Sequence, residues 1–188
     1  MKKYNPKKIR IVFFIFIIIL AVFLRFWGIP GSDLQHDTAI NSVRAYGWFD
    51  YLTGQGQTSP VVWFSEIPWW ANLSFHDHPP LTFFIQNIFF KVVGASTFSA
   101  LLPFILAGIG VVFLIYFFLK NIELKKEALL ASFLFAISAH SVWVSRSGYL
   151  EGIEIFFIFL GFICFIYFLY FDKKRYLFFG QPVFHWLF

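Results

Sequence analysis

Residues 9–27 read IRIVFFIFIIILAVFLRFW, and this apolar run decides the class of fold. At a rise of about 1.5 Å per residue, a helix of this length crosses the roughly 30 Å hydrocarbon core of a bilayer. Lysines lead into the run, as in a secretory signal peptide, but its apolar core is long and no small-residue cleavage site follows. The sequence therefore predicts a retained membrane anchor.

Three further apolar runs reach spanning length, at residues 98–119, 127–144 and 153–171. The whole chain of 188 residues is 59% hydrophobic and only 13% charged, which is too apolar for an ordinary soluble domain. We therefore expect an all-α, polytopic transmembrane protein with four spans.

The basic residues indicate topology. Nucleic-acid binding would need them on one soluble face, but they gather beside the spans: before the first at Lys2, Lys3, Lys7, Lys8 and Arg10, after the second at Lys120, Lys125 and Lys126, and after the fourth at Lys173, Lys174 and Arg175. No nucleic-acid partner is predicted. We expect a multi-pass protein of the plasma or inner membrane with a cytoplasmic N-terminus.

With that orientation, residues 28–97 and the turn SRSGYLEG at 145–152 lie on the outer face. Residues 38–53 and 81–94 have helical apolar spacing and are expected to be amphipathic helices at the membrane interface. In the first of these, Arg44 is expected to turn away from the apolar face. A helix at 81–94 is short for a span, and counting it as one would place the KNIELKKE segment outside, against the charge bias.

The most specific motif is HPPL at 78–81, followed by the expected short helix, by Gly94 and by FSALLPFILAG from residue 98. Together with the anchor and an acid at Asp37, this order resembles the lipid-dependent membrane glycosyltransferases of the GT-C fold, in particular the protein mannosyltransferase and aminoarabinose transferase-like superfamily. The resemblance covers roughly residues 9–171. Two positions depart from the family pattern: Leu101 replaces its usual arginine, and Thr38 stands where Asp37 would be followed by glutamate.

The resemblance implies roles for individual residues. It makes Asp37 the catalytic base, places His78 near the phosphate of a lipid donor, and gives the second outer turn an Arg146 and a secondary acid, Glu151. A sugar on a polyprenyl phosphate already has a good leaving group, so the enzyme needs a base for the acceptor hydroxyl and cations for the phosphate. Arg146 and His78 are the expected phosphate-binding residues. The acceptor would be a protein, a glycolipid or a polysaccharide. The resemblance also implies inversion at the anomeric carbon.

Each of these residues also has a structural interpretation. Asp37 would be a good N-cap for a helix starting at Thr38, and Arg146 would snorkel to the interface at a helix end. The trio His76, Asp77 and His78 suggests a divalent metal, although two histidines and one acid in a loop more often make local hydrogen bonds. No cofactor is otherwise implied.

A non-enzymatic membrane protein, such as a transporter fragment or an assembly subunit, is the alternative class. Transporters tend to have polar residues at mid-membrane, whereas these spans are nearly free of charge and the polar residues collect outside. The chain ends in the apolar run FFGQPVFHWLF, which suggests an N-terminal portion of a longer transferase or an inactive truncated remnant.

Overall fold

The computed structural model describes residues 6–29, 33–47, 78 and 81–171. Across these ranges all regular structure is helical, in seven helices. They are α1 (Pro6–Phe26), α2 (His36–Gly47), α3 (Leu81–Val93), α4 (Thr97–Asn121), α5 (Lys125–Ile137), α6 (Ala139–Ser147) and α7 (Glu151–Phe171). The expected all-α polytopic fold is confirmed.

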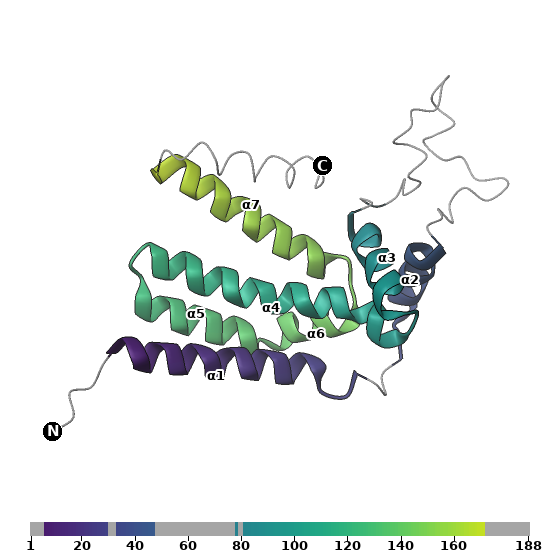
Figure 1. Ribbon diagram of the computed structural model, residues 1–188, viewed down its shortest axis with the longest axis horizontal. Coiled ribbons are helices and arrows are strands. Elements are labelled where there is room, and N and C mark those ends of the chain that lie inside the picture. The colour runs from purple at the N-terminus through teal and green to yellow at the C-terminus, as the bar shows by residue number, and fades with distance from the viewer. Residues whose placement is uncertain (1–5, 30–32, 48–77, 79–80, 172–188) are drawn as a thin grey trace, which may run out of the picture.

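Helix α4 is the centre of the bundle, because it contacts α1, α3, α5, α6 and α7. Figure 1 shows α1, α4 and α5 lying along one axis, α7 inclined to them, and α2 and α3 grouped at one end of the bundle. One core cluster joins Ile17 and Ala21 of α1 to Val112 of α4 and Ala136 of α5. Small side chains at such contacts let helices approach closely in a membrane.

Local signals explain where α1 and α4 begin and end. Pro6 opens α1, a position that needs no backbone N–H, and Gly28 follows α1 with a positive φ of 74°. Ser96 caps α4 through a reciprocal pair: its hydroxyl accepts from the Ser99 N–H at 3.1 Å, and the Ser99 hydroxyl accepts from the Ser96 N–H at 3.0 Å.

In the described residues, three helices are long and apolar enough to cross a membrane: α1, α4 and α7. The expected third span at 127–144 corresponds to two helices, α5 and α6, which meet at Ser138 and are bent by 54°. The pair makes a fourth span only if it is counted as one broken helix. Ser138 ends α5 and accepts a hydrogen bond from the Ser141 N–H at 3.4 Å, so it caps α6.

The two short helices differ from expectation in their bounds and their faces. The helix expected at 38–53 begins earlier, at His36, and is described to Gly47; residues 48–53 lie outside the described part. Arg44 does not turn away from the core: it is 1% exposed and stacks 4.7 Å from the centre of the Phe83 ring. This cation–π contact and the stem packing favour burial over an outward orientation.

Helix α3 likewise buries polar residues and exposes apolar ones. The Gln86 amide donates to the Ser42 hydroxyl at 2.9 Å and to the Ala100 carbonyl at 2.8 Å, and the Asn87 amide donates to the Ala45 carbonyl at 2.7 Å. Phe84 and Val92 are exposed. Buried amides must find partners, whereas apolar side chains are stable facing lipid, so this inverted pattern suits a helix at membrane depth.

Candidate functional site at the α2 and α6–α7 junction

The start of α2 docks onto the turn between α6 and α7. The Thr38 hydroxyl donates to the Ser147 carbonyl at 2.5 Å, and the Gln35 amide donates to the Ser147 hydroxyl at 3.4 Å. The Tyr149 hydroxyl donates back to the Gln35 side-chain oxygen. Two segments more than one hundred residues apart in the chain therefore meet at one end of the bundle, beside α2 in Figure 1.

Gly148 makes this close approach possible. It ends α6 in the left-handed region, with φ of +71°. A Cβ atom at this position would lie 2.6 Å from Cγ2 of Thr38 and 2.8 Å from Cδ2 of Leu101. The position therefore needs glycine for its backbone conformation and for the space that Thr38 occupies.

Asp37 is exposed in the first turn of α2, directly before the buried Thr38. The interpretation of Asp37 as an N-cap is wrong, because the first helical bond runs from the Ala39 N–H to the Gln35 carbonyl and α2 begins at His36. A carboxylate in the first turn still interacts favourably with the helix dipole. Its exposure leaves the Asp37 carboxylate accessible to a proton donor from water or from a substrate.

Arg146, in the last turn of α6, is half-buried and lies against the C-terminal end of α1. Its Nη1 donates to the Leu24 carbonyl at 3.3 Å, and its Nη2 would lie 3.8 Å from a Cβ atom placed on Gly28. The last carbonyls of a helix are electronegative and attract a cation. Arg146 therefore has a helix-end role in this structure, and its guanidinium lies at the same end of the bundle as the docked α2.

His78 and the acids at the start of α7 are also brought together. His78 and Glu151 are exposed and Glu154 is half-buried. Glu154 interacts electrostatically with both Glu151 and His78. The structure thus brings His78, from the segment before α3, within electrostatic range of Glu154 of α7, which the sequence positions did not indicate.

The expected alternative of a metal at His76, Asp77 and His78 falls largely outside the described residues, which include only His78. Within the part of the chain that is described, no three His, Cys, Asp or Glu side chains gather as a metal site would require.

Arg25 is a polar residue of the bundle that the sequence analysis missed. Its side chain is fully buried, and its guanidinium donates to the Ser145 hydroxyl at 3.3 Å, the Ser141 hydroxyl at 3.0 Å and the Ala136 carbonyl at 3.1 Å. Arg25 thereby supports α6, the helix that carries Arg146. It is the only charged residue in the apolar stretch 11–27, and a charge inside a span is the signal that identifies it.

Comparisons with known proteins agree with this architecture. Residues 77–184 match the family model of dolichyl-phosphate-mannose-protein mannosyltransferase, a region that includes His78, Arg146 and Glu151 but not Asp37. Two similar proteins of Bacillus subtilis (strain 168) are named "Putative mannosyltransferase YkcB", 37% identical over 84 residues, and "Putative mannosyltransferase YycA", 34% identical over 84 residues. Each alignment covers 45% of this chain.

The aligned part spans 12% of the length of either relative. No solved structure matches this chain. The family match nevertheless covers more than half of the sequence, and it lies on the helices that build the bundle from α3 to α7. The chain belongs to the dolichyl-phosphate-mannose-protein mannosyltransferase family.

Proposed function

We propose that this chain contributes to a membrane glycosyltransferase that moves a sugar, mannose in the first instance, from a polyprenyl-phosphate donor to an acceptor hydroxyl on the non-cytoplasmic face. The family match and the two relatives named as mannosyltransferases support the class of reaction. The basic residues that flank α1 and the α4–α5 turn favour a cytoplasmic N-terminus in the cell membrane.

One observation supports the assignment of the site: the 2.5 Å hydrogen bond from Thr38 to Ser147. It holds the turn that bears Asp37 against the turn between Arg146 and Glu151, although the residues are far apart in sequence. His78 interacts electrostatically with Glu154 in the first turn of α7. These contacts support the proposal that Asp37, His78, Arg146 and Glu151 act at one site.

In the proposed reaction, the acceptor oxygen attacks the anomeric carbon while the bond from that carbon to the phosphate oxygen breaks. Asp37 takes the proton of the acceptor hydroxyl, and the polyprenyl phosphate leaves with the bonding electrons. Arg146 and His78 would stabilise the charge that develops on the phosphate, and Glu151 would be a secondary acid. A single displacement inverts the anomeric configuration.

The test is transfer by the protein expressed at its full natural length and reconstituted in liposomes. The donor is a synthetic polyprenyl-phosphate mannose, and the acceptors are a peptide, a glycolipid and a polysaccharide in separate assays. We expect mannosyl transfer to one acceptor. NMR should show that the anomeric configuration of the product is inverted relative to the donor. Lack of transfer to every acceptor, or a product that keeps the donor configuration, contradicts the proposal.

A further inference from the structure

A basic pocket lies at the opposite end of the bundle from the candidate site. Its volume is about 300 Å³, and it is lined by Lys7, Arg10 and Ile11 of α1, Tyr116 and Lys120 of α4, and Lys125 of α5. In Figure 1 this end holds the start of α1 and the turn from α4 to α5, while α2 and α3 lie at the other end. The volume is at the lower end of the roughly 300–1,000 Å³ of small-ligand sites.

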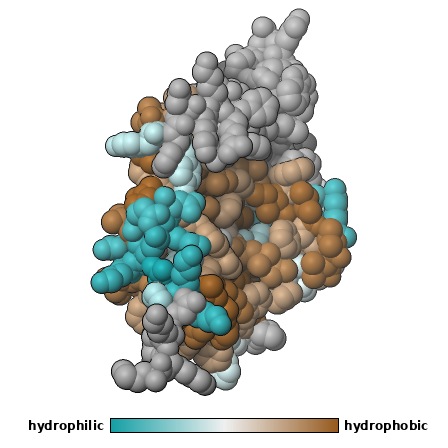
Figure 2. All heavy atoms as spheres, turned by 60° about the vertical axis from the view of Figure 1, so that its left-hand side comes forward, coloured by the Kyte–Doolittle hydropathy of each residue, from teal (hydrophilic) through white to brown (hydrophobic). Residues whose placement is uncertain are grey.

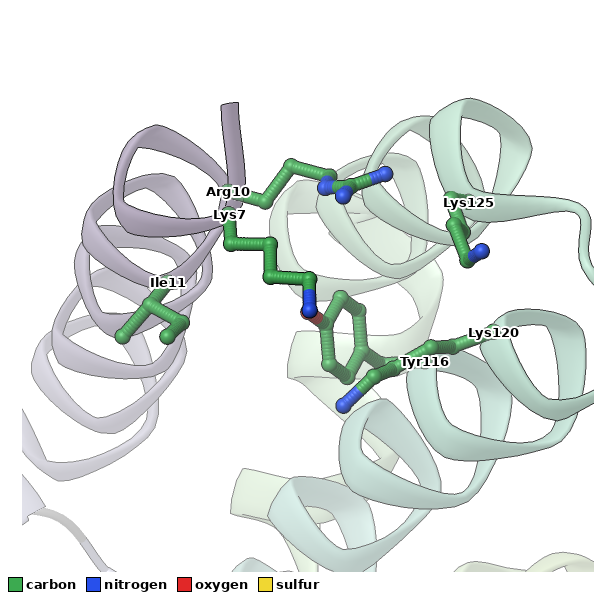
Figure 3. Close-up of a pocket in the computed structure, with 6 residues that line it drawn as sticks. All are labelled: Lys7, Arg10, Ile11, Tyr116, Lys120 and Lys125. Carbon is green, nitrogen blue, oxygen red and sulfur yellow. The ribbon is translucent and has the colours of Figure 1, made fainter. Parts of the chain in front are cut away.

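The four cations of the pocket come from three different helices. Figure 3 shows the Lys7 side chain reaching from α1 to Tyr116 and the Arg10 side chain extending above that ring toward the side of Lys125, with Lys120 beside the ring. The Lys120 ammonium lies 5.6 Å from the centre of the Tyr116 ring and 5.4 Å from that of Phe117. Cation–π contacts of this kind keep the ammonium group at the pocket wall.

Among the described residues, Glu123 is the acid that interacts with the pocket cations. Glu123 is paired with Lys125, which lowers the pKa of Glu123 below its usual range, and Arg10 lowers it further. Among the described residues at this end, Lys8 and Lys126 add two exposed cations and Glu127 one exposed acid. An excess of positive charge therefore remains, and it is concentrated where the three helices meet.

The pocket opens beside apolar surface. Ile11 lines the pocket and continues along α1 into a stripe with Ile15 and Ile19, which are 56%, 52% and 62% exposed. Residues four apart lie on one face of a helix, so the stripe follows the α1 axis away from the charges. In Figure 2 the larger hydrophilic patch on this side of the molecule borders hydrophobic surface.

From this arrangement we infer that the pocket binds the phosphate headgroup of an anionic membrane phospholipid, with its acyl chains lying along the Ile11, Ile15 and Ile19 stripe of α1. The cations can neutralise the single negative charge of a phosphodiester and donate hydrogen bonds to its oxygens, and the adjoining apolar stripe distinguishes a lipid from a free phosphate ion. Basic pockets between helices at the membrane surface have the chemistry that such headgroups require. The site is separate from the proposed transfer reaction.

The experiment measures retention of phosphatidylglycerol. The full-length protein is reconstituted in phosphatidylcholine nanodiscs with increasing phosphatidylglycerol, and native mass spectrometry counts the bound anionic lipid. The pocket variant is Arg10→Gln with Lys120→Gln. The matched control is Lys8→Gln with Lys126→Gln, which removes the same charge from the same end but from residues outside the pocket.

The pocket variant should weaken phosphatidylglycerol binding about fivefold for each charge removed. The control should change binding by about twofold or less, since separated exposed charges are screened. Glu123→Gln releases Lys125 from its ion pair and should strengthen binding by a factor of about two to five. Charge-preserving Arg10→Lys with Lys120→Arg should restore most of the binding.

Two results would overturn the inference. Equal weakening of lipid binding in the pocket variant and the control would mean that diffuse positive charge attracts the lipid. The basic residues of the pocket would then only reflect the topology of the chain. Displacement of phosphatidylglycerol by inorganic phosphate at matched millimolar concentration would mean a free-anion site without a role for the α1 stripe. Failure of the transfer assay would not affect the interpretation of the lipid-binding results, because the lipid measurement does not depend on catalysis.

Discussion

Nη1 of Arg25 lies 3.1 Å from the carbonyl oxygen of Ala136 and donates a hydrogen bond to it. Ala136 is in the last turn of α5, where helical carbonyls lack partners within their own helix. The same guanidinium binds Ser141 and Ser145 of α6, on the other side of the break at Ser138. A cation of α1 therefore holds both halves of the bent helix pair.

Replacing Arg25 should destabilise the bundle. In Arg25→Met the Ala136 carbonyl is left buried without this donor, a loss of about 1–3 kcal/mol for an unsatisfied polar group. Thermal unfolding in detergent should show a lower midpoint for Arg25→Met and an intermediate one for Arg25→Lys, which keeps the charge but loses the planar fork. The control is Lys8→Met, an exposed cation of the same helix. Equal midpoints for Arg25→Met and the control would refute this role.

Gly108 should be sensitive to a single methyl group. A Cβ atom there would lie 2.1 Å from Oγ of Ser145 and 3.0 Å from Nε of Arg25. Gly108→Ala must displace these groups, at a cost of about 1–3 kcal/mol for overpacking. Ser145→Ala removes the closest atom, so Gly108→Ala should cost less in that background.

A double-mutant cycle of unfolding midpoints measures this coupling. Additive effects of Gly108→Ala and Ser145→Ala would show that the two positions do not touch.

Gly148 and Gly94 form a matched pair for the docking of α2. Both have positive φ, of 71° and 90°, so an alanine is strained at either position. A Cβ atom on Gly148 would also collide with Thr38, whereas one on Gly94 has no atom within 4 Å. Gly148→Ala should therefore lose more stability than Gly94→Ala, by about 1–3 kcal/mol, and more transfer activity. Equal losses would mean that the contact with Thr38 does not matter.

The sequence predicts most of the fold, because long apolar runs and flanking lysines are direct consequences of the bilayer. It misses the helix break at Ser138, where the polar stretch SAHS at 138–141 falls within a single predicted span. The break is stabilised by Arg25 of another helix, which supplies a hydrogen-bond donor for the buried Ala136 carbonyl. Such a contact joins residues 111 positions apart, and no local pattern contains it.

The faces of the short helices could not be predicted for a related reason. Apolar periodicity assigns the inner face correctly only when the outer face meets water. In α3 the outer face is apolar, and Gln86 and Asn87 turn inward to α2 and α4. In the candidate site, Asp37, His78, Arg146 and Glu151 were chosen by resemblance, while the Thr38–Ser147 contact that joins their segments became visible only in the structure.

Arg146→Gln should impair use of the lipid donor. A phosphate contact that strengthens in the transition state is lost with the guanidinium, so kcat/KM for the donor should fall by about 10- to 100-fold while the KM for the acceptor changes little. Lys91→Gln, an exposed cation at the far end of α3, is the control. Because Arg146 also donates a hydrogen bond to the Leu24 carbonyl, the unfolding midpoint of the Arg146→Gln protein must be measured together with its kinetics. A defect in acceptor use alone would contradict the phosphate role.

The most direct test of the central claim compares Asp37→Asn with Asp33→Asn in the full-length protein. Both carboxylates are exposed, they are four residues apart before and within the first turn of α2, and both substitutions keep the side-chain size. Initial rates of sugar transfer from polyprenyl-phosphate mannose should fall by about 100-fold or more for Asp37→Asn and remain near wild type for Asp33→Asn. Wild-type turnover by folded Asp37→Asn protein would show that Asp37 is not the base.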